Sequence, residues 1–208
     1  NLDNGGNVHG TYYVDGYPSL LGITDTHYRV LTMDEWTAVL GLNATTKNYA
    51  YVRITYTKRV TDATHTYGHQ VDLTQNGMIL LPPGTDAYFA GTGITRGQTY
   101  NSWADAPVIT SEEFEELESH GCSFLPAFGY VYHHENSGVY ADNGEGYYRT
   151  STPGSPDGSG SFAYVLHFTP STTPGFLTDI HYGEGVAVRL FYVAHGTNPY
   201  AGPAPTSK

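Results

Sequence analysis

Cysteine and positive charge are both scarce in this chain. Cys122 is the only cysteine among 208 residues, which excludes an internal disulfide and any zinc site built from several cysteines. Nine Lys and Arg stand against 20 Asp and Glu, so the formal net charge is −11. Nucleic acids and anionic membranes both attract basic protein faces, and we expect neither as a partner. No apolar run approaches the ~20 residues of a membrane-spanning helix.

Tyrosine, glycine and small polar residues make up much of the chain instead. There are 19 tyrosines and 25 glycines, while only 14% of residues are charged. This composition is more typical of an extracellular bacterial or viral surface protein than of a cytosolic enzyme. We therefore expect an extracellular location, on a cell surface or a phage particle. The start at Asn1 rather than methionine is compatible with removal of an export signal.

The first of two predicted helices begins after Thr32. Glu35 follows three residues later, which is the spacing of a capping box, and Gly41 is the expected end. The apolar residues fall on one helical face: Met33, Trp36, Val39 and Leu40. The second helix repeats the signal with Thr110 and Glu113, and its expected end is Gly121.

Alternating or apolar runs predict strands around these helices. They cover 49–60 with a hairpin partner at 65–73, then 76–84, 122–130, 162–168 and 186–193. The chain is thus predicted to be α+β, with two helices packed on a mixed, mainly antiparallel β core and long irregular loops. We expect an N-terminal strand and loop part at 1–27, a domain at 28–193 with a hairpin insertion at 49–75, and a Pro/Gly-rich tail at 194–208.

Metal ligands are poorly arranged in the sequence. His133 and His134 are adjacent, so they point to opposite sides of a strand, and His65 and His69 have helical ligand spacing in a segment that is not helical. Calcium stays open as a structural ion, because oxygen ligands occur in predicted loops: Asp15, Asp142, Asn143, Glu145 and Asp157. "DNGEG" lacks the acidic residue that closes an EF-hand loop.

Catalytic motifs are also missing. There is no G-x-S-x-G elbow, and Cys122 lies in an apolar run where a buried, inert thiol is expected. "GTGITRG" has neither a Walker lysine nor the third glycine of a dinucleotide fingerprint. The glutamates at 112–118 are typical of a solvated helix face. We therefore expect no cofactor and no enzymatic activity.

Residues 146–168, "GYYRTSTPGSPDGSGSFAYVLHF", allow two interpretations on composition alone. One is an ordinary hairpin in which half of the aromatic residues are buried in the core. The other is a contact surface, because tyrosine provides area at low entropic cost and Ser, Gly and Asp provide adaptable hydrogen bonds. The residues themselves do not decide between them.

Six motifs in order are similar to one known family. "YRVLTMDEWTAVL" resembles the W-R-L-P-T-x-x-E-W-x-x-L signature of the Fibrobacter succinogenes major paralogous domain, which is common in Bacteroidetes surface proteins. The others are "NGMILLPPG", "FEELESHGCSFLPAFGYVY", "GYYRTSTP", "AYVLHF" and "GVAVRLFYV", close to the family's GLILLP, FLPAAGYR, GYYWSSTP, AYYLYF and GYSVRLV. The resemblance covers residues 28–193.

This resemblance implies a C-type-lectin-like fold, of the branch shared with the formylglycine-generating enzyme and with the variable proteins of diversity-generating retroelements. In such variable proteins a fixed framework carries a C-terminal patch of diversified, ligand-contacting side chains. Some are phage receptor-binding proteins, and others are displayed on bacterial cells. The ligand implied here is a protein or a surface glycan.

The resemblance divides the C-terminal half into framework and contact positions. The framework positions are Trp36, Pro126, Gly129, Tyr147, Tyr148, Ser151, Thr152, Pro153, Leu166, Phe168, Val188, Arg189 and Leu190. The contact positions are Arg149, Thr150, Ser155, Asp157, Phe162, Tyr164, His167, Thr178, Asp179, His181, Tyr182 and Glu184.

The chain also departs from the sequence pattern of this family. Arg149 stands where the family has tryptophan, and one cysteine cannot supply the paired catalytic cysteines of the enzyme branch. The calcium signatures E-P-N, Q-P-D and W-N-D of sugar-binding lectins are absent as well. Two alternatives stay open beside the binding module. One is a structural or fimbrial surface module without a varied site, and the other is a metal-dependent enzyme on the same fold.

Overall fold

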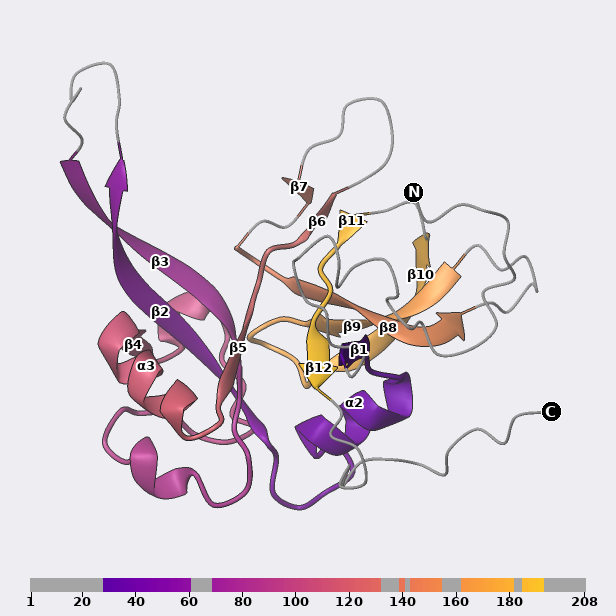
Figure 1. Ribbon diagram of the computed structural model, residues 1–208, viewed down its shortest axis with the longest axis horizontal. Helices are drawn as coiled ribbons and strands as arrows, with labels where there is room; N and C mark the ends of the chain where they lie inside the picture. The colour runs from indigo at the N-terminus through magenta and orange to yellow at the C-terminus, as the bar shows by residue number, and fades with distance from the viewer. Residues whose placement is uncertain are drawn as a thin grey trace.

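The computed structural model describes residues 28–60, 69–131, 139–140, 143–154, 162–181 and 185–192. This part of the chain is α+β, with two α-helices and several small sheets, and most of its regular structure is strand (Figure 1). The expected N-terminal part at 1–27 and the tail at 194–208 lie outside the described residues.

A long hairpin forms the middle layer of the fold. β2 (Tyr49–Val60) and β3 (His69–Leu80) pair antiparallel in one unbroken register. β5 (Ser123–Pro126) pairs antiparallel with β3, and β4 (Val108–Thr110) pairs parallel with β2, so the sheet is mixed. β3 is one strand, so the prediction of separate strands at 65–73 and 76–84 was wrong. Gly77 lies inside it, and a Cβ there would come within 2.4 Å of the Phe124 ring.

The C-terminal half forms a second antiparallel sheet and two small ones. The second sheet contains β8 (Gly146–Gly154), β9 (Phe162–Phe168) and β10 (Gly175–His181). The small sheets contain β1 (Tyr28–Val30) with β12 (Leu190–Tyr192), and β6 (Tyr130–Val131) with β7 (Val139–Tyr140) and β11 (Gly185–Val186). The predicted strand at 162–168 is confirmed, whereas residues 187–189 separate β11 from β12 in the strand expected at 186–193.

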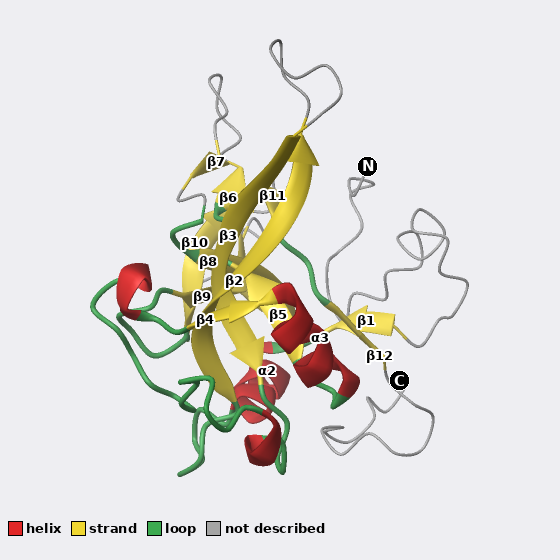
Figure 2. Ribbon diagram, turned by 90° about the vertical axis from the view of Figure 1, so that its left-hand side faces the viewer, coloured by secondary structure: helices red, strands yellow, loops and turns green. Residues whose placement is uncertain are grey.

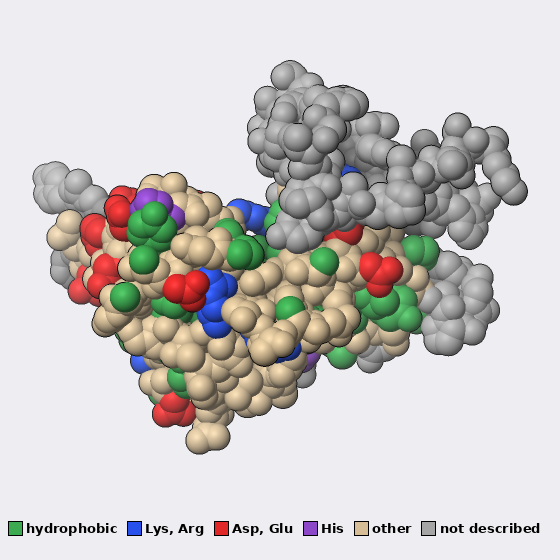
Figure 3. Space-filling model, turned by 90° about the horizontal axis from the view of Figure 1, so that it is seen from below, with side chains coloured by type: hydrophobic (Ala, Val, Ile, Leu, Met, Phe, Trp, Pro, Cys, Tyr) green, Lys and Arg blue, Asp and Glu red, His purple; other side chains and the backbone are tan. Residues whose placement is uncertain are grey.

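Both predicted capping boxes are present. α2 (Met33–Leu40) is capped by Thr32 and Glu35, and it ends at Gly41, which has a left-handed φ of 63°. α3 (Ser111–Ser119) is capped by Thr110 and Glu113. Figure 3 shows acidic side chains gathered at the end of the molecule where α3 lies.

The irregular segment between β3 and β4 contains two short 3-10 helices, η1 (Asp86–Tyr88) and η2 (Trp103–Asp105). Arg96 fixes its first part by donating to the carbonyl oxygens of Leu81 at 2.6 Å and Pro82 at 2.9 Å. The guanidinium also pairs with Asp86 at 2.8 Å. Arg96 thus donates hydrogen bonds to backbone carbonyl oxygens that are not paired within a strand.

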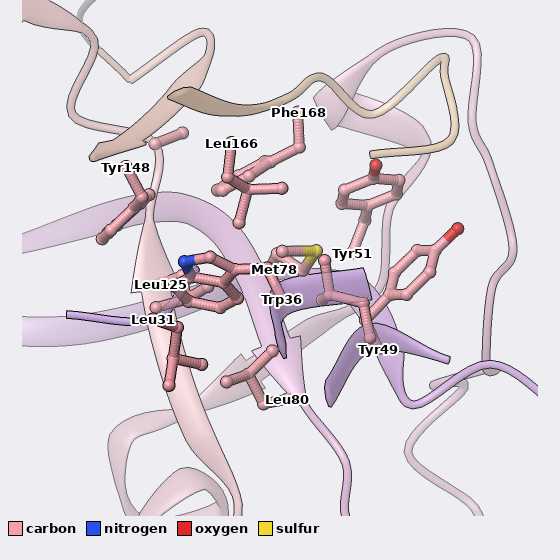
Figure 4. Packing of buried hydrophobic residues seen from close by; sticks show 12 residues of the cluster. Leu31, Trp36, Tyr49, Tyr51, Met78, Leu80, Leu125, Tyr148, Leu166 and Phe168 are labelled. Carbon is pink, nitrogen blue, oxygen red and sulfur yellow. The ribbon is translucent and has the colours of Figure 1, made fainter. Parts of the chain in front are cut away.

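The base of the β2–β3 hairpin is buried on both faces. On one face Tyr51 and Met78 pack with α2 and with β9 in a cluster centred on Trp36 (Figure 4). On the other face Ile54 packs in a second cluster with Leu117 of α3 and with Cys122. Cys122 is buried, as predicted, and burial raises the pKa of its thiol.

Candidate functional site

Two hydrogen bonds fix the strand that carries the candidate site to α2 and to Leu31 just before it. The N–H of Met33 donates to the Thr152 hydroxyl oxygen at 2.8 Å, and the N–H of Ser151 donates to the carbonyl oxygen of Leu31 at 2.9 Å. The first helix turn and the middle of β8, 119 residues apart in sequence, therefore meet directly. These are two of the segments on which the family resemblance rests.

The start of α2 is locked by a charged pair. Arg29 makes a two-pronged contact with Glu35, whose second oxygen also accepts the Thr32 N–H at 2.9 Å. Burial raises the pKa of the Glu35 carboxyl, but the bonds from Arg29 and the Thr32 backbone outweigh it, so the pKa is lowered overall. Arg29, Thr32 and Glu35 of the signature motif thus serve the framework.

One predicted contact residue lies in the core. Thr150 has no exposed surface, and its hydroxyl donates to the carbonyl oxygen of Tyr164 at 2.7 Å. The Thr150 hydroxyl oxygen in turn accepts the Thr152 N–H at 3.2 Å. The β8–β9 register shifts between Arg149 and Pro153, and the Thr150 hydroxyl links the two strands at this irregularity. The structure therefore contradicts a surface role for Thr150.

Five predicted contact positions reach solvent on the second sheet. Arg149 on β8 and Phe162, Tyr164 and His167 on β9 are half-buried, and Thr178 on β10 is exposed. The other six lack described side chains. Asp179 and His181 belong to β10, and Ser155, Asp157, Tyr182 and Glu184 lie outside the described residues. Among the framework positions, Val188 is 43% exposed.

A polar and aromatic cluster surrounds His167. Its Nε2 lies 2.6 Å from Oε2 of Glu145, and the Tyr147 hydroxyl donates to the same oxygen at 2.5 Å. The rings of Tyr147 and His167 are 4.7 Å apart, and Tyr130 meets Tyr147 edge-on at 4.8 Å. Sequence reasoning did not include Glu145 among the contacts. Tyr147 on β8 lies directly opposite His167 on β9. This strand register brings the Glu145 carboxylate to the imidazole.

The cluster combines charge with access to solvent. The side chains of His167 and Glu145 are 22% and 31% exposed. Burial raises the pKa of the Glu145 carboxyl. The hydrogen bonds from Tyr147 and His167 lower this pKa by more than burial raises it, so the net shift is downward. The Glu145 carboxylate and the His167 imidazole can bind a partner's hydrogen-bond donors, and the half-buried Tyr130 ring can contact its apolar groups, whereas Tyr147 is buried.

The loop before Glu145 is held rigidly against the hairpin. Asn143 has a positive φ of 54°, and its Oδ1 accepts the Asn76 N–H at 2.7 Å and the Gln75 side-chain amide at 2.9 Å. The indole N–H of Trp103 donates to the Gly144 carbonyl oxygen at 2.6 Å. The carboxylate of the cluster is therefore positioned by bonds to two other parts of the domain.

The described residues contain neither a metal-binding cluster nor the nucleophile–base pair of a covalent hydrolase. Within them no group of three or more His, Cys, Asp or Glu side chains is placed to hold a metal ion. The histidines at 65, 133 and 134 and the acids at 15, 142 and 157 lie outside that part of the chain. In the described residues His167 bonds to Glu145, and no hydroxyl or thiol forms the nucleophile–base pair of a covalent hydrolase with it.

Comparison with protein-family models, with curated proteins and with solved structures found no match to this chain. The described part contains no helix long and apolar enough to cross a membrane. The function must therefore be argued from the sequence motifs and from the geometry of the β8–β9–β10 sheet.

Proposed function

We propose that this chain is a non-enzymatic binding module with a C-type-lectin-like fold, displayed on a cell or phage surface. Its contact patch, on the β8–β9–β10 sheet and the loops between these strands, is diversified by a retroelement. One observation carries the proposal: buried framework positions and solvent-reaching contact positions occur on the same strands. Leu166 and Phe168 are fully buried, while Tyr164 and His167 beside them reach solvent.

The binding mechanism follows from this division. The framework keeps its shape because hydrogen bonds join β8 to α2 and to Leu31, and because the Trp36 cluster packs these segments together. Contact side chains can then change without repacking the core, since they lie outside it. The ligand is a protein or a surface glycan bound without a metal. His167 supplies aromatic contact and Glu145 supplies charge on one face of β9, and Tyr164 supplies aromatic contact on the opposite face.

Screening against arrays of extracellular proteins and glycans, followed by alanine substitution, tests the proposal. For any partner found, we expect His167→Ala or Tyr164→Ala to weaken binding by about tenfold or more, according to which face of β9 the ligand covers. Tyr88→Ala is the matched control, because Tyr88 is 46% exposed but lies on η1, outside the contact patch. A partner whose affinity ignores both substitutions, in variants with unchanged circular dichroism, would refute the proposed patch.

A further inference from the structure

The hydrogen bonds of the His167 cluster determine where its protons lie. The pKa of the Glu145 carboxyl is lowered, so near neutral pH this group is an anion that can only accept hydrogen bonds. Its Oε2 accepts from the Tyr147 hydroxyl at 2.5 Å and lies 2.6 Å from Nε2 of His167. Nε2 must therefore carry a hydrogen, and the lone pair of the neutral imidazole is on Nδ1.

The Glu145–His167 pair has two further acceptor atoms. In the part of the chain that the structure describes, no hydrogen bond engages Oε1 of Glu145 or Nδ1 of His167. Neither atom is among the polar atoms that are buried without a partner, so both reach solvent. At neutral pH the pair thus offers a ligand a carboxylate oxygen and an imidazole lone pair, together with one negative charge.

Aromatic rings lie beside this pair. The rings of Tyr147 and His167 are 4.7 Å apart, and Tyr130 of β6 meets Tyr147 edge-on. Gly129 bridges Gly146, which places the small sheet of β6, β7 and β11 beside the start of β8 (Figures 1 and 2). Tyr130 is half-buried, and a partly exposed aromatic ring attracts cations as well as apolar groups.

A positive charge on the same face of β8 lies further along the strand. Arg149 follows Tyr147 by two residues, so both side chains lie on one face, and Nη1 of Arg149 is buried. Four residues of extended chain separate the Cα atoms of Arg149 and Glu145 by about 13 Å. This exceeds the Debye length of about 8 Å at physiological ionic strength. On β10 the residue opposite His167 is Gly175, which has no charge.

We propose that the Glu145–His167 pair binds a basic side chain, lysine or arginine, of a protein ligand. The ammonium or guanidinium N–H groups donate to Oε1 of Glu145 and to Nδ1 of His167, and the carboxylate neutralises the positive charge. This inference rests on the proposed function, because it names the ligand chemistry of the same contact patch.

Charge favours a basic protein over a neutral glycan as this ligand. A sugar hydroxyl can donate to Oε1 of Glu145, but it brings no charge to the carboxylate, and charge-assisted hydrogen bonds are about twice as strong as neutral ones. The whole chain has a formal net charge of −11. Such a charge speeds the encounter with a basic partner and slows it with an acidic one.

Binding of a basic group should depend on the protonation of His167. A proton on Nδ1 converts the acceptor into a donor and adds a positive charge beside the ligand. The groups that face the imidazole are Glu145 and Tyr147, with Arg149 further along β8. Affinity should therefore be highest at about pH 8 and fall towards about pH 5, the range in which imidazoles gain a proton.

Blocked tripeptides test the ligand chemistry without a known partner. Acetyl-Gly-Arg-Gly-amide and its lysine, citrulline and glutamate analogues are titrated into the full chain, and the histidine ring signals are followed by NMR. The signals of His167 are those missing from His167→Gln. At about pH 8 the arginine and lysine peptides should bind about tenfold more tightly than the citrulline peptide, the uncharged analogue of arginine, and this preference should vanish at about pH 5.

The peptide titrations give clear contrary results as well. Equal affinities for the arginine and citrulline peptides would overturn the proposal. So would His167 signals that respond to neither cationic peptide more than to the glutamate peptide. The tighter of the two cationic peptides identifies which basic side chain the site prefers.

Glutamine substitution tests the carboxylate with a matched control. Glu145→Gln removes the charge but keeps an oxygen that can accept from Tyr147 and His167, so the cationic peptides should bind about tenfold more weakly. Glu116→Gln is the control, because Glu116 also lies beside a histidine, 3.2 Å from Nε2 of His120, but on α3 beyond the β2–β3 hairpin (Figure 1). It should change affinity by less than about twofold. Equal effects of the two substitutions would overturn the proposed site.

A protein partner found by the array screen separates this inference from the proposed function. We expect such a partner to lose about tenfold in affinity with Glu145→Gln. A partner that requires His167 or Tyr164 but is indifferent to Glu145→Gln and to acidification refutes the basic-group inference alone. A partner that ignores His167→Ala and Tyr164→Ala refutes the contact patch, and this inference with it.

Discussion

The two helices begin with the same local motif but have different roles in the fold. Thr32 with Glu35 and Thr110 with Glu113 form equivalent capping boxes. In α2 the glutamate also binds Arg29, and its side chain is only 13% exposed. In α3 the capping glutamate is exposed and, among the described residues, has no arginine partner.

Tertiary contacts explain this difference. α2 is bonded to β8 and buries Trp36 in the cluster beneath the candidate contact sheet, whereas α3 covers the far face of the hairpin and fully buries only Leu117. Damage to α2 should therefore reach the contact patch, while damage to α3 should remain local. Matched substitutions in the two helices test this difference.

The largest effect is expected for Trp36. Trp36→Ala should lower the free energy of unfolding by about 3–5 kcal/mol, because it leaves a large cavity in a fully buried site. Urea denaturation measures the loss. Trp36→Phe should cost less, since the buried indole N–H has no hydrogen-bond partner among the described residues. In α3 the half-buried Phe114→Ala is the matched change, and a cost as large as that of Trp36→Ala would contradict the comparison.

Removal of Arg29 is expected to have the next largest effect. Arg29→Met leaves the mostly buried Glu35 carboxylate without its guanidinium, at a cost of about 2–3 kcal/mol. The double variant with Glu35→Gln should recover part of this loss, because no unpaired charge remains. Glu113→Gln in α3 should change stability by less than about 0.5 kcal/mol in the same denaturation series. Equal losses of unfolding free energy for Arg29→Met and Glu113→Gln would show that the Arg29–Glu35 pair does not stabilise the fold.

The cap threonines should differ by a smaller margin. Thr32→Ala should cost about 1–2 kcal/mol and Thr110→Ala about 0.5–1 kcal/mol, because only the first cap lies in a part-buried network. Serine at either position should retain most of the stability, which separates the lost hydrogen bond from the lost methyl group. A larger loss at Thr110 would reverse the ranking of the helices.

The smallest effect concerns pH. The folded pKa of Glu35 is lowered, so its contribution to stability is complete above the unfolded value of roughly 4.3 and is lost as pH falls through the folded pKa. The unfolding midpoint of the wild type should therefore fall more steeply below that pH than the midpoint of Glu35→Gln. Parallel pH profiles for the two proteins would contradict the role of the charged pair.

Local signals sufficed to predict both helices and the strands β2 and β9, whereas β1, β4 and β10 were not predicted. The capping boxes and Gly41 act within a few residues, so the ends of α2 and the start of α3 were predictable. The length of β3 was not, because Gly77 resembles a turn residue until the Phe124 ring is placed beside it. The parallel pairing of β4 with β2 is equally non-local.

The candidate site was predictable only in part, because some of its contacts depend on strand pairing between distant segments. The family resemblance implies contact roles for Tyr164 and His167, and both reach solvent. The burial of Thr150 follows from the register shift in β8, and Glu145 joins the cluster only through strand pairing and the Asn143 clamp. Neither can be recognised from neighbouring residues in the sequence.

Deep sequencing of this gene across a population of its source tests the central claim most directly. The account predicts substitutions concentrated in codons 149–184, arising from adenines, at the contact positions that reach solvent. Trp36, Thr150, Leu166 and Phe168, all fully buried, should stay fixed. A uniform and mostly synonymous pattern would contradict a diversified contact patch, and would leave a module whose surface is constant.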